Sequence, residues 1–468
     1  MRHDPISPEL FGANRARLAK LLPPNSLAFV NANDIPPTNA DGTMAFTPNS
    51  DLFYLSGIEQ EQTILLLYPD ADEEEHREIL FLREPTPELE LWEGHKLTKD
   101  EGRQVSGIRR IHWLSEFPRL FHRLMCECEH VVLNSNEHKR AVVEVQSRDA
   151  RFVAETKAKY PLHDYQRLAP LLHRLRAVKT EQELTLIRRA CQITGDGLER
   201  VLRFTRPGVR ETEIEAELAH EFIRQGSRFA YLPIIAAGKN ACCLHYLHNS
   251  NQCRKGQLVL MDVAASYANY NSDMTRTIPV SGKFTPRQRR VYQAVLRILR
   301  HCIKGLTPGK KLKDWQKEAE QVTEKELVDL RLLSLAQIKR QDPDQPAFKR
   351  YFMHGVGHPL ELDVHDVGIT TEPVQAGWVM TVEPAIYVRD EGFAVRLEND
   401  VLITEQGAVD LMADIPIDSD EIEEHMKRRP KFSPSGNGGN GEAGHARRVR
   451  GPAKIQSRLM PANQLLRR

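Results

Sequence analysis

Two acidic residues follow or precede short apolar runs in the middle of the chain. The run Leu258–Met261 has the composition of a buried strand and leads directly to Asp262. A polar turn then leads to Asp273, which precedes a second β-prone run, Thr275–Val280. Acids at the inner ends of buried strands are costly unless a positive charge meets them, and a metal ion suits that role. On this segment alone, both acids could equally be ordinary turn or strand-end residues.

Three further places downstream hold groups of the right type. His354 and His358 are the first and last residues of the segment HGVGH. Glu383 follows an apolar run and precedes a proline, and Glu398 lies in the sequence VRLEN. Taken singly, the histidines would be capping or packed residues, and Glu398 would be half of an ion pair with Arg396.

Taken together, four carboxylates and one imidazole are a ligand set for two divalent ions about 3.5–4 Å apart. The set comprises Asp262, Asp273, His358, Glu383 and Glu398. Because it is rich in oxygen, it favours manganese before zinc, with cobalt or iron as alternatives. Structural zinc sites prefer thiolates and imidazoles, which this set mostly lacks.

The first part of the chain, residues 1–175, is predicted to be a self-contained α/β domain. A helix is expected over Glu9–Leu22, followed by apolar runs that alternate with polar, helix-prone pieces. Since this part holds no glycine-rich phosphate loop and no ligand cluster, we interpret it as a scaffold or an oligomerisation domain. Trp92, in ELWEGHKL, is either a core residue or an interface residue that reaches a neighbour's cleft.

Residues 176–415 are predicted to form an α+β domain, in which an antiparallel sheet is covered by helices on one face. Thr180 and Glu183 form a capping box that starts its first long helix. Besides the two runs already described, strands are expected at Tyr231–Ala236, Trp378–Val382 and Val395–Ile403.

Overall composition argues for an acidic body with a basic end. The 468 residues include 65 Lys or Arg and 64 Asp or Glu, so no global field requires nucleic acid or membrane. Residues 416–468 are predicted to be a polar, basic, disordered tail, with eleven basic residues and one acid from Lys427 onward.

The seven cysteines lack a regular spacing and are interpreted as reduced thiols. No apolar signal core or membrane-length run is present, so the cytoplasm is the expected location.

The ordered motifs resemble those of the pita-bread metallopeptidases, which include methionine aminopeptidases, prolidases and aminopeptidase P. They are the eleven-residue step from Asp262 to Asp273, then HGxxH, TVEP and RLE. The phrases NSDLFYLSG at 49–57, LWEG at 91–94 and LHY at 244–246 are similar to aminopeptidase P specifically. The resemblance covers residues 10–412. It implies a pita-bread catalytic domain after a smaller α/β domain, and a metal-dependent aminopeptidase that hydrolyses the N-terminal X-Pro bond.

Carried over residue by residue, the resemblance implies two divalent ions, with Asp262 and Asp273 on one and His358 and Glu383 on the other. Asp273 and Glu398 would bridge the ions. A hydroxide between them would be the nucleophile, and Glu383 would be the general base. His245 and His365 would stabilise the tetrahedral intermediate. The proline pocket would be lined by His354, Tyr231, Arg396 and Tyr387. A dimer or tetramer is also implied, with no membrane and no specific nucleic-acid partner.

Two positions depart from the aminopeptidase P pattern and keep alternatives open. Pro359, with the leucine that follows it, is similar to bacterial prolidases, and Glu361 adds a charge near the site. One alternative is therefore a prolidase restricted to X-Pro dipeptides, in which Arg396 would hold the substrate's carboxylate. The alternative from another class is an inactive pita-bread module that binds peptides, although all five ligand positions are filled.

Overall fold

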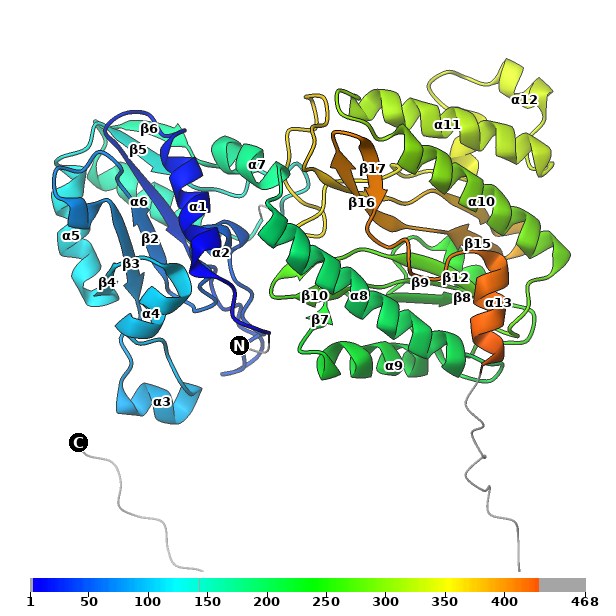
Figure 1. The fold of residues 1–468 in the computed structure, drawn as a ribbon, viewed down its shortest axis with the longest axis horizontal. Helices are drawn as coiled ribbons and strands as arrows, with labels where there is room; N and C mark the ends of the chain where they lie inside the picture. Colours follow the sequence, from blue (N-terminus) through cyan, green and yellow to red (C-terminus); the bar gives the residue numbers. More distant parts are fainter. Residues whose placement is uncertain (1–2, 143, 429–468) are drawn as a thin grey trace, which may run out of the picture. The chain divides into compact units, whose positions relative to one another are not determined.

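The first part of the chain forms one six-stranded mixed sheet (Figure 1). The structure is a computed structural model that describes residues 3–142 and 144–428. The sheet has the order β4-β3-β2-β1-β5-β6, and β1 pairs antiparallel with β2 and parallel with β5. Its strands are β1 (Ser26–Asn31), β2 (Ile64–Leu67), β3 (Glu78–Leu82), β4 (Arg110–Trp113), β5 (His130–Leu133) and β6 (Asp164–Arg167).

Seven α-helices of the described residues accompany this sheet. They are α1 (Pro8–Ala19), α2 (Ser50–Ser56), α3 (Pro87–Glu93), α4 (Lys99–Ser106), α5 (Phe117–Met125), α6 (Arg148–Lys159) and α7 (Ala169–Ala177). The motif NSDLFYLSG is α2 with its caps: the Asn49 side chain accepts two N–H groups, and Gly57 ends the helix at φ 67°. Trp92 is 79% exposed on α3, so the core interpretation of this residue is wrong for the single chain.

The second part contains small antiparallel sheets and six helices, and the predicted fold class is confirmed. The strand orders are β11-β10-β7, β12-β9-β8, β13-β16-β17 and β14-β15. Its strands are β7 (Arg228–Phe229), β8 (Ile234–Ala237), β9 (Leu258–Asp262), β10 (Ala265–Tyr267), β11 (Tyr270–Asn271), β12 (Thr275–Pro279), β13 (Val379–Val382), β14 (Ala385–Val388), β15 (Phe393–Arg396), β16 (Asn399–Thr404) and β17 (Gly407–Asp410). Its helices are α8 (Glu181–Phe204), α9 (Glu211–Arg224), α10 (Pro286–Gly305), α11 (Leu312–Asp329), α12 (Leu335–Arg340) and α13 (Ser419–Lys427).

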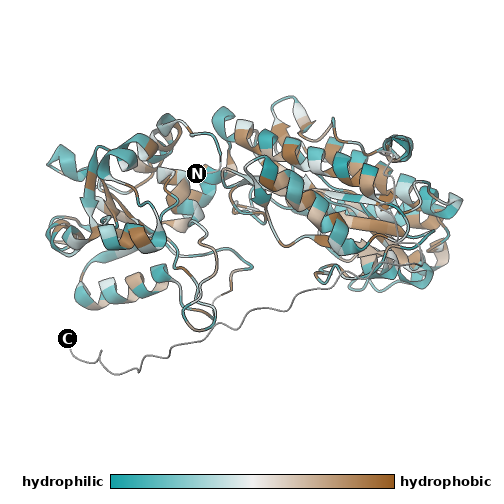
Figure 2. Ribbon diagram, turned by 90° about the horizontal axis from the view of Figure 1, so that it is seen from below, coloured by the Kyte–Doolittle hydropathy of each residue, from teal (hydrophilic) through white to brown (hydrophobic). Residues whose placement is uncertain are grey.

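Amphipathic helices pack on these sheets. The predicted capping box of Thr180 and Glu183 starts α8, which contacts β10 and β11, while α9 contacts β8. Figure 2 shows helices that alternate hydrophobic and hydrophilic residues, with brown, hydrophobic strands among them. Residues 3–428 belong to one compact unit, so the domain boundary near residue 175 stays a prediction. Within the described ranges, every helix is too short or too polar to span a membrane.

Two strands differ from the prediction in ways that shape the site. β8 begins at Ile234, which leaves Tyr231 in the preceding loop. The run Val395–Ile403 is two strands, since β15 ends at Arg396 and β16 begins at Asn399. The chain changes partners here: β15 pairs with β14, whereas β16 pairs with β13 and β17. Glu398 lies in the break, and its N–H donates to the carbonyl of Thr275 (3.1 Å).

The prediction of a disordered tail from residue 416 is wrong for the described residues up to 428. They include α13, which begins after a capping box of Asp418 and Glu421. Ile422 and Met426, one helical turn apart, are 0% and 1% exposed. Burial of this apolar stripe holds the helix against the body, because a short helix gains most of its stability from tertiary packing. Residues 429–468, with most of the basic end, lie outside the described residues.

The replacement Ile422→Ala is expected to lower the free energy of unfolding by about 2–5 kcal/mol, because it leaves a cavity under α13. Urea unfolding followed by circular dichroism measures the loss. Glu424 is exposed on the same helix, so Glu424→Ala should change stability by less than about 0.5 kcal/mol. Equal stability of the two variants would contradict the packing of α13.

Candidate active site

The antiparallel pairing of β9 and β12 brings Asp262 and Asp273 together. Asp262 is the last residue of β9, and Asp273 lies just before β12. Between them, β10 and β11 form a hairpin whose turn residues, Ala268 and Asn269, both have positive φ (51° and 66°). The Tyr231 hydroxyl lies 2.5 Å from Asp262 Oδ1 and 2.6 Å from Asp273 Oδ1. The two predicted acids therefore lie close together, on either side of the Tyr231 hydroxyl.

His358 joins this pair because its loop lies along β13. The N–H of Thr381 donates to the carbonyl of His358 (2.8 Å), and the N–H of His358 donates to the Thr381 hydroxyl (3.1 Å). Gly357 permits this approach, since a Cβ there would lie 2.0 Å from the Thr381 carbonyl oxygen. His358 Nε2 then lies 3.5 Å from Asp273 Oδ2 and 3.9 Å from Glu383 Oε1.

Glu398 completes the group from the break between β15 and β16. The Thr275 hydroxyl donates to Glu398 Oε2 (2.7 Å) and so orients the carboxylate. Ligand atoms of Asp273, His358 and Glu398 all lie within 4.8 Å of one another. The structure thus brings together the five residues predicted as ligands: Asp262, Asp273, His358, Glu383 and Glu398.

The electrostatics of this group fit a cation. Burial raises the pKa of Glu383 to about 7. Burial, and then the charge of Asp273, raises the pKa of Glu398 well above its ordinary value. Although burial alone would lower it, the contact with Asp273 and the charge of Glu383 raise the pKa of His358 to about 9. Buried carboxylates that hold protons this tightly are a donor set that divalent ions would satisfy.

A hydrogen-bonded triad lies beside the acids. The Tyr387 hydroxyl accepts a hydrogen bond from Arg396 Nη1 (2.9 Å) and lies 3.0 Å from His354 Nε2. Arg396 Nε donates to the Thr275 hydroxyl (3.0 Å), and Nη2 donates to Asp262. Burial, and then the charge of Arg396, lowers the pKa of His354 to about 4, so its imidazole is neutral at neutral pH.

The two other predicted histidines lie at the edge of the group. The His365 ring meets the His358 ring edge-to-face, with centroids 4.4 Å apart. His365 also lines a cavity of about 540 Å³, whose wall includes Asn134 and Arg148 of the first part. His245 is exposed, and its charge is one of the smaller causes that lower the pKa of His354.

Sequence reasoning missed two buried residues that hydrogen-bond to candidate ligands. Thr275 bonds both Arg396 and Glu398, as described above. Asp400 Oδ2 accepts the N–H of Asp273 (3.0 Å) and the thiol of Cys191 (3.4 Å). Asp400 follows Glu398 by two residues, but Glu398 lies in the break before β16, so strand periodicity gave no signal for Asp400.

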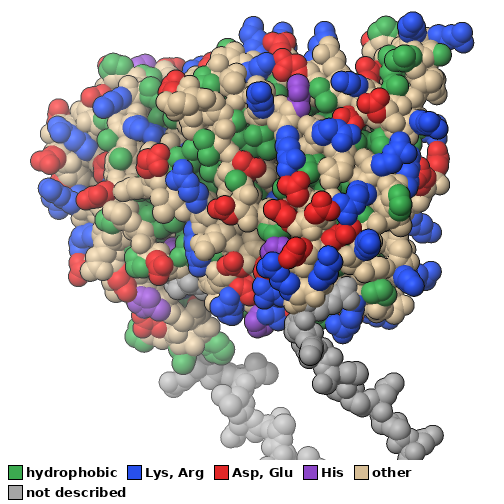
Figure 3. Space-filling model, turned by 45° about the vertical axis from the view of Figure 1, so that its right-hand side comes forward, with side chains coloured by type: hydrophobic (Ala, Val, Ile, Leu, Met, Phe, Trp, Pro, Cys, Tyr) green, Lys and Arg blue, Asp and Glu red, His purple; other side chains and the backbone are tan. Residues whose placement is uncertain are grey.

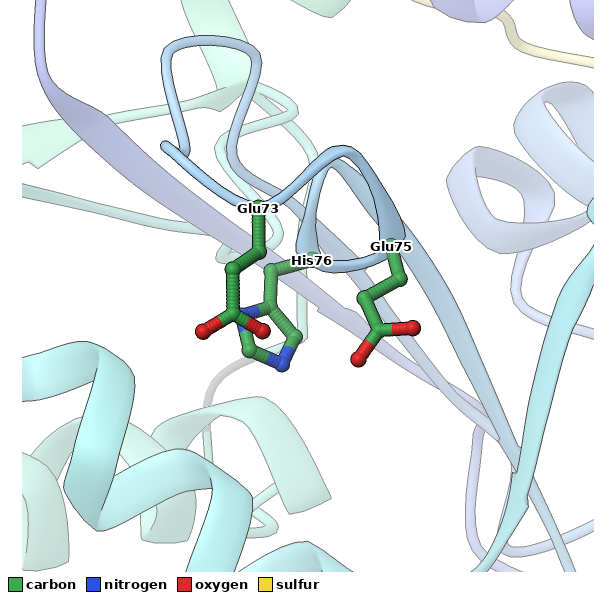
Figure 4. A group of neighbouring side chains, drawn as sticks. All are labelled: Glu73, Glu75 and His76. Atoms are coloured by element: carbon green, nitrogen blue, oxygen red, sulfur yellow. The ribbon is translucent and has the colours of Figure 1, made fainter.

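A second group of three potential ligands, Glu73, Glu75 and His76, lies outside this site (Figure 4). Both glutamates are exposed and already have arginine partners: Glu73 pairs with Arg123 and Glu75 with Arg110. We interpret this group as ordinary surface ion pairs.

Comparisons with known proteins agree with this geometry. The family model described as metallopeptidase family M24 matches residues 185–405, and the model of the aminopeptidase P N-terminal domain matches residues 11–133. The Xaa-Pro aminopeptidase of Haemophilus influenzae is 34% identical over 436 residues, which are 89% of this chain and 97% of that protein. The Xaa-Pro aminopeptidase of Escherichia coli is 32% identical over 442 residues, 90% of this chain and 98% of that protein.

Solved structures are similar over the same span. Zinc-substituted E. coli aminopeptidase P in complex with product superposes with a TM-score of 0.80 at 32% identity, covering 92% of this chain and 100% of that one. E. coli aminopeptidase P with the inhibitor Pro-Leu has a TM-score of 0.79 at 31% identity, covering 91% and 99%.

Proposed function

Because the chain belongs to the aminopeptidase P family of metal-dependent aminopeptidases, we propose that it removes the first residue from peptides with proline in second position. The observation that carries this proposal is the group of five potential metal ligands, three of them with ligand atoms within 4.8 Å of one another, beside the triad of His354, Tyr387 and Arg396. An X-Pro bond has no N–H on its leaving nitrogen and carries a fixed ring, so general peptidases fit it poorly. A flat pocket beside a strongly polarising site addresses both features.

The proposed cofactor is a pair of divalent ions, manganese before cobalt, zinc or iron. The residues that would hold them are Asp262 and Asp273 on one ion, His358 and Glu383 on the other, and Asp273 and Glu398 between the two. When bound, the ions would polarise the scissile carbonyl and lower the pKa of a water molecule. Oxygen-rich donors with raised pKa values support this assignment.

The chain's own groups would then bind and orient the peptide. Glu383 would act as general base, because its carboxylate lies within the group of proposed ligands, 3.9 Å from His358 Nε2. His245 and His365 would donate hydrogen bonds to the scissile peptide. His354, Tyr387 and Arg396 would contact the proline ring. Tyr231 would offer only its ring, because its hydroxyl is already bonded to two acids.

The prolidase alternative is not favoured. The relatives described above are Xaa-Pro aminopeptidases that align with about nine-tenths of this chain. Arg396 is also poorly placed to grip a substrate carboxylate, because its three nitrogens already donate to Asp262, Thr275 and Tyr387. The unusual Glu361 is 0% exposed and pairs with Arg176 (3.2 Å), so its charge faces away from solvent. The inactive-module alternative conflicts with the complete ligand set.

The deciding experiment is hydrolysis by the metal-stripped protein, with and without added manganese. An X-Pro-X tripeptide and a Gly-Pro dipeptide are offered side by side. We expect manganese-dependent cleavage of the tripeptide at its first bond. Cleavage of the dipeptide alone would make the protein a prolidase. Cleavage of neither peptide, with metal shown to be bound, would overturn the substrate proposal.

The replacement Tyr387→Phe is expected to lower kcat/KM for the tripeptide about tenfold. It removes a hydroxyl that joins His354 and Arg396, and a buried hydrogen bond is worth about 1–1.5 kcal/mol. Tyr292→Phe is the control, since the buried hydroxyl of Tyr292 on α10 donates to the carbonyl of Ile417 (2.7 Å). Equal activity of both variants would remove Tyr387 from the proposed pocket.

We also propose a homo-oligomer, a dimer or tetramer, in which α3 contributes to the interface. Leu91 and Trp92 are 80% and 79% exposed on this helix, and adjacent exposed apolar side chains of this size mark contact surfaces. Figure 3 shows basic and acidic side chains interspersed over one face. The expectations of a cytoplasmic location and of no specific nucleic-acid partner stay predictions.

A further inference from the structure

One buried arginine, Arg176, contacts four carboxylates from two parts of the chain. Its Nη1 lies 2.8 Å from Asp51, and its Nε lies 3.2 Å from Glu361. Its Nη2 lies 2.9 Å from Asp363 and 2.6 Å from Asp366. The Arg176 side chain is 2% exposed. A guanidinium holds its donors in a rigid plane, so it fixes the directions of all four partners at once.

Three of these partners belong to the loop 359–366, which begins immediately after His358 and contains His365. Apart from an isolated bridge between Pro359 and Met380, this loop has no helix or strand in the described structure. Two backbone bonds lie within it, from the N–H of Asp366 to the carbonyl of Pro359 (3.0 Å) and from the N–H of Glu361 to the carbonyl of Asp363 (3.2 Å). Its first half is also tied to strands, since Leu360 donates to the carbonyl of Val379 (3.1 Å) and the N–H of Asn271 donates to the carbonyl of Glu361 (2.9 Å). The bonds from Arg176 to Asp363 and Asp366 add to these on either side of His365.

The fourth partner ties this loop to the first part of the chain. Asp51 lies on α2, and its second oxygen accepts a hydrogen bond from Asn134 Nδ2 (2.9 Å). Ser50, also on α2, donates its hydroxyl to Asp363 (2.8 Å). Arg176 itself lies in the last turn of α7. The guanidinium thus lies at the centre of a network that joins α2, α7 and the loop 359–366.

We propose that Arg176 is a positioning residue that holds the loop 359–366 so that His365 stands against His358. His365 lies between two of the arginine's partners, Asp363 and Asp366, and lines the same cavity as Arg176. The proposal rests on the proposed function, in which His365 contacts the scissile peptide. The backbone of His358 is held separately by Thr381, so loss of Arg176 should displace His365 and spare the metal ligand.

The charge balance around Arg176 explains why its loss would open the loop. Among the described residues, Glu361 Oε1 and Asp366 Oδ2 are buried without a hydrogen-bond partner. Burial raises the pKa of Glu361 to about 7 and also raises that of Asp366. Removal of the guanidinium would take away the cation that bonds both acids and leave only the charge of Lys179 to offset their repulsion.

The test compares Arg176→Gln, Arg176→Lys and the matched control Arg174→Gln. Arg174 lies on the same helix and makes an exposed ion pair with Glu372 (2.8 Å). For Arg176→Gln we expect faster hydrogen exchange in residues 359–367, unchanged metal content and a loss of about 100-fold in kcat/KM on the tripeptide. Lysine keeps the charge but not the planar fork, so Arg176→Lys should be intermediate. Arg174→Gln should match the wild type.

A third variant separates positioning from charge neutralisation. Arg176→Gln combined with Glu361→Gln and Asp366→Asn removes the repulsion, so it should regain thermal stability while activity stays low. Regained activity in this variant, loss of metal from Arg176→Gln, or wild-type exchange in residues 359–367 would each overturn the proposal. Hydrogen exchange is read whether or not the wild type cleaves peptide, so an inactive wild type would count against the proposed function alone.

Discussion

Replacing Asp273 by asparagine is expected to lower kcat/KM on an X-Pro-X tripeptide by about 1,000-fold or more. Asp273 Oδ2 lies 3.5 Å from His358 Nε2, and the same carboxylate is proposed to contact both ions. Metal ions contribute several kcal/mol of transition-state stabilisation, and each 1.36 kcal/mol is a factor of ten in rate. Loss of about 4 kcal/mol therefore corresponds to this fall.

The measurement pairs steady-state kinetics with metal content by mass spectrometry. We expect fewer than two ions per chain in Asp273→Asn. Asp390→Asn is the matched control, because Asp390 is 75% exposed and pairs with Arg350 at the surface. A variant at position 273 that keeps both ions and full activity would remove Asp273 from the centre.

The titration of Glu383 is expected to lower the free energy of unfolding of the metal-free protein by about 3 kcal/mol as the pH rises from about 4.5 to about 8. Burial raises its pKa from 4.5 to about 7 in the folded protein. The folded state therefore binds this proton more tightly than the unfolded state, so the stabilisation is complete below pH 4.5 and is lost as the pH passes 7. Each pKa unit corresponds to about 1.4 kcal/mol, which sets the size of the effect.

Urea unfolding in the presence of a chelator, at pH 4.5 and pH 8, measures this loss. The Glu383→Gln variant isolates the contribution of the one carboxyl, since glutamine does not titrate. We expect its pH dependence to be smaller than that of the wild type by about 3 kcal/mol. Added manganese should remove most of the difference, because a bound cation takes the place of the proton. Identical pH profiles for the two proteins would contradict the raised pKa.

The sequence by itself determined the elements with a strong local pattern and named the candidate groups of the site. The strand predicted over the apolar run before Asp262 is β9, Leu258–Asp262. The capping box at Thr180 starts α8 as predicted. Such elements can be predicted from the sequence because apolar periodicity and capping residues act over a few positions. The four acidic candidate ligands could be chosen because acids beside buried strands are costly without a cation.

Only the tertiary structure decided how these residues are held. The break that exposes Glu398 to the other acids arises because β15 and β16 have different partner strands, which no local pattern records. The helix α13 was likewise not predicted from the sequence, because it depends on the burial of its apolar residues against the body. The same holds for Arg176, since its four carboxylates lie up to 190 residues away along the chain. Hydrogen bonds and burial between distant segments depend on the assembled fold. The sequence therefore predicts which residues are candidates, and only the structure shows which residues they contact.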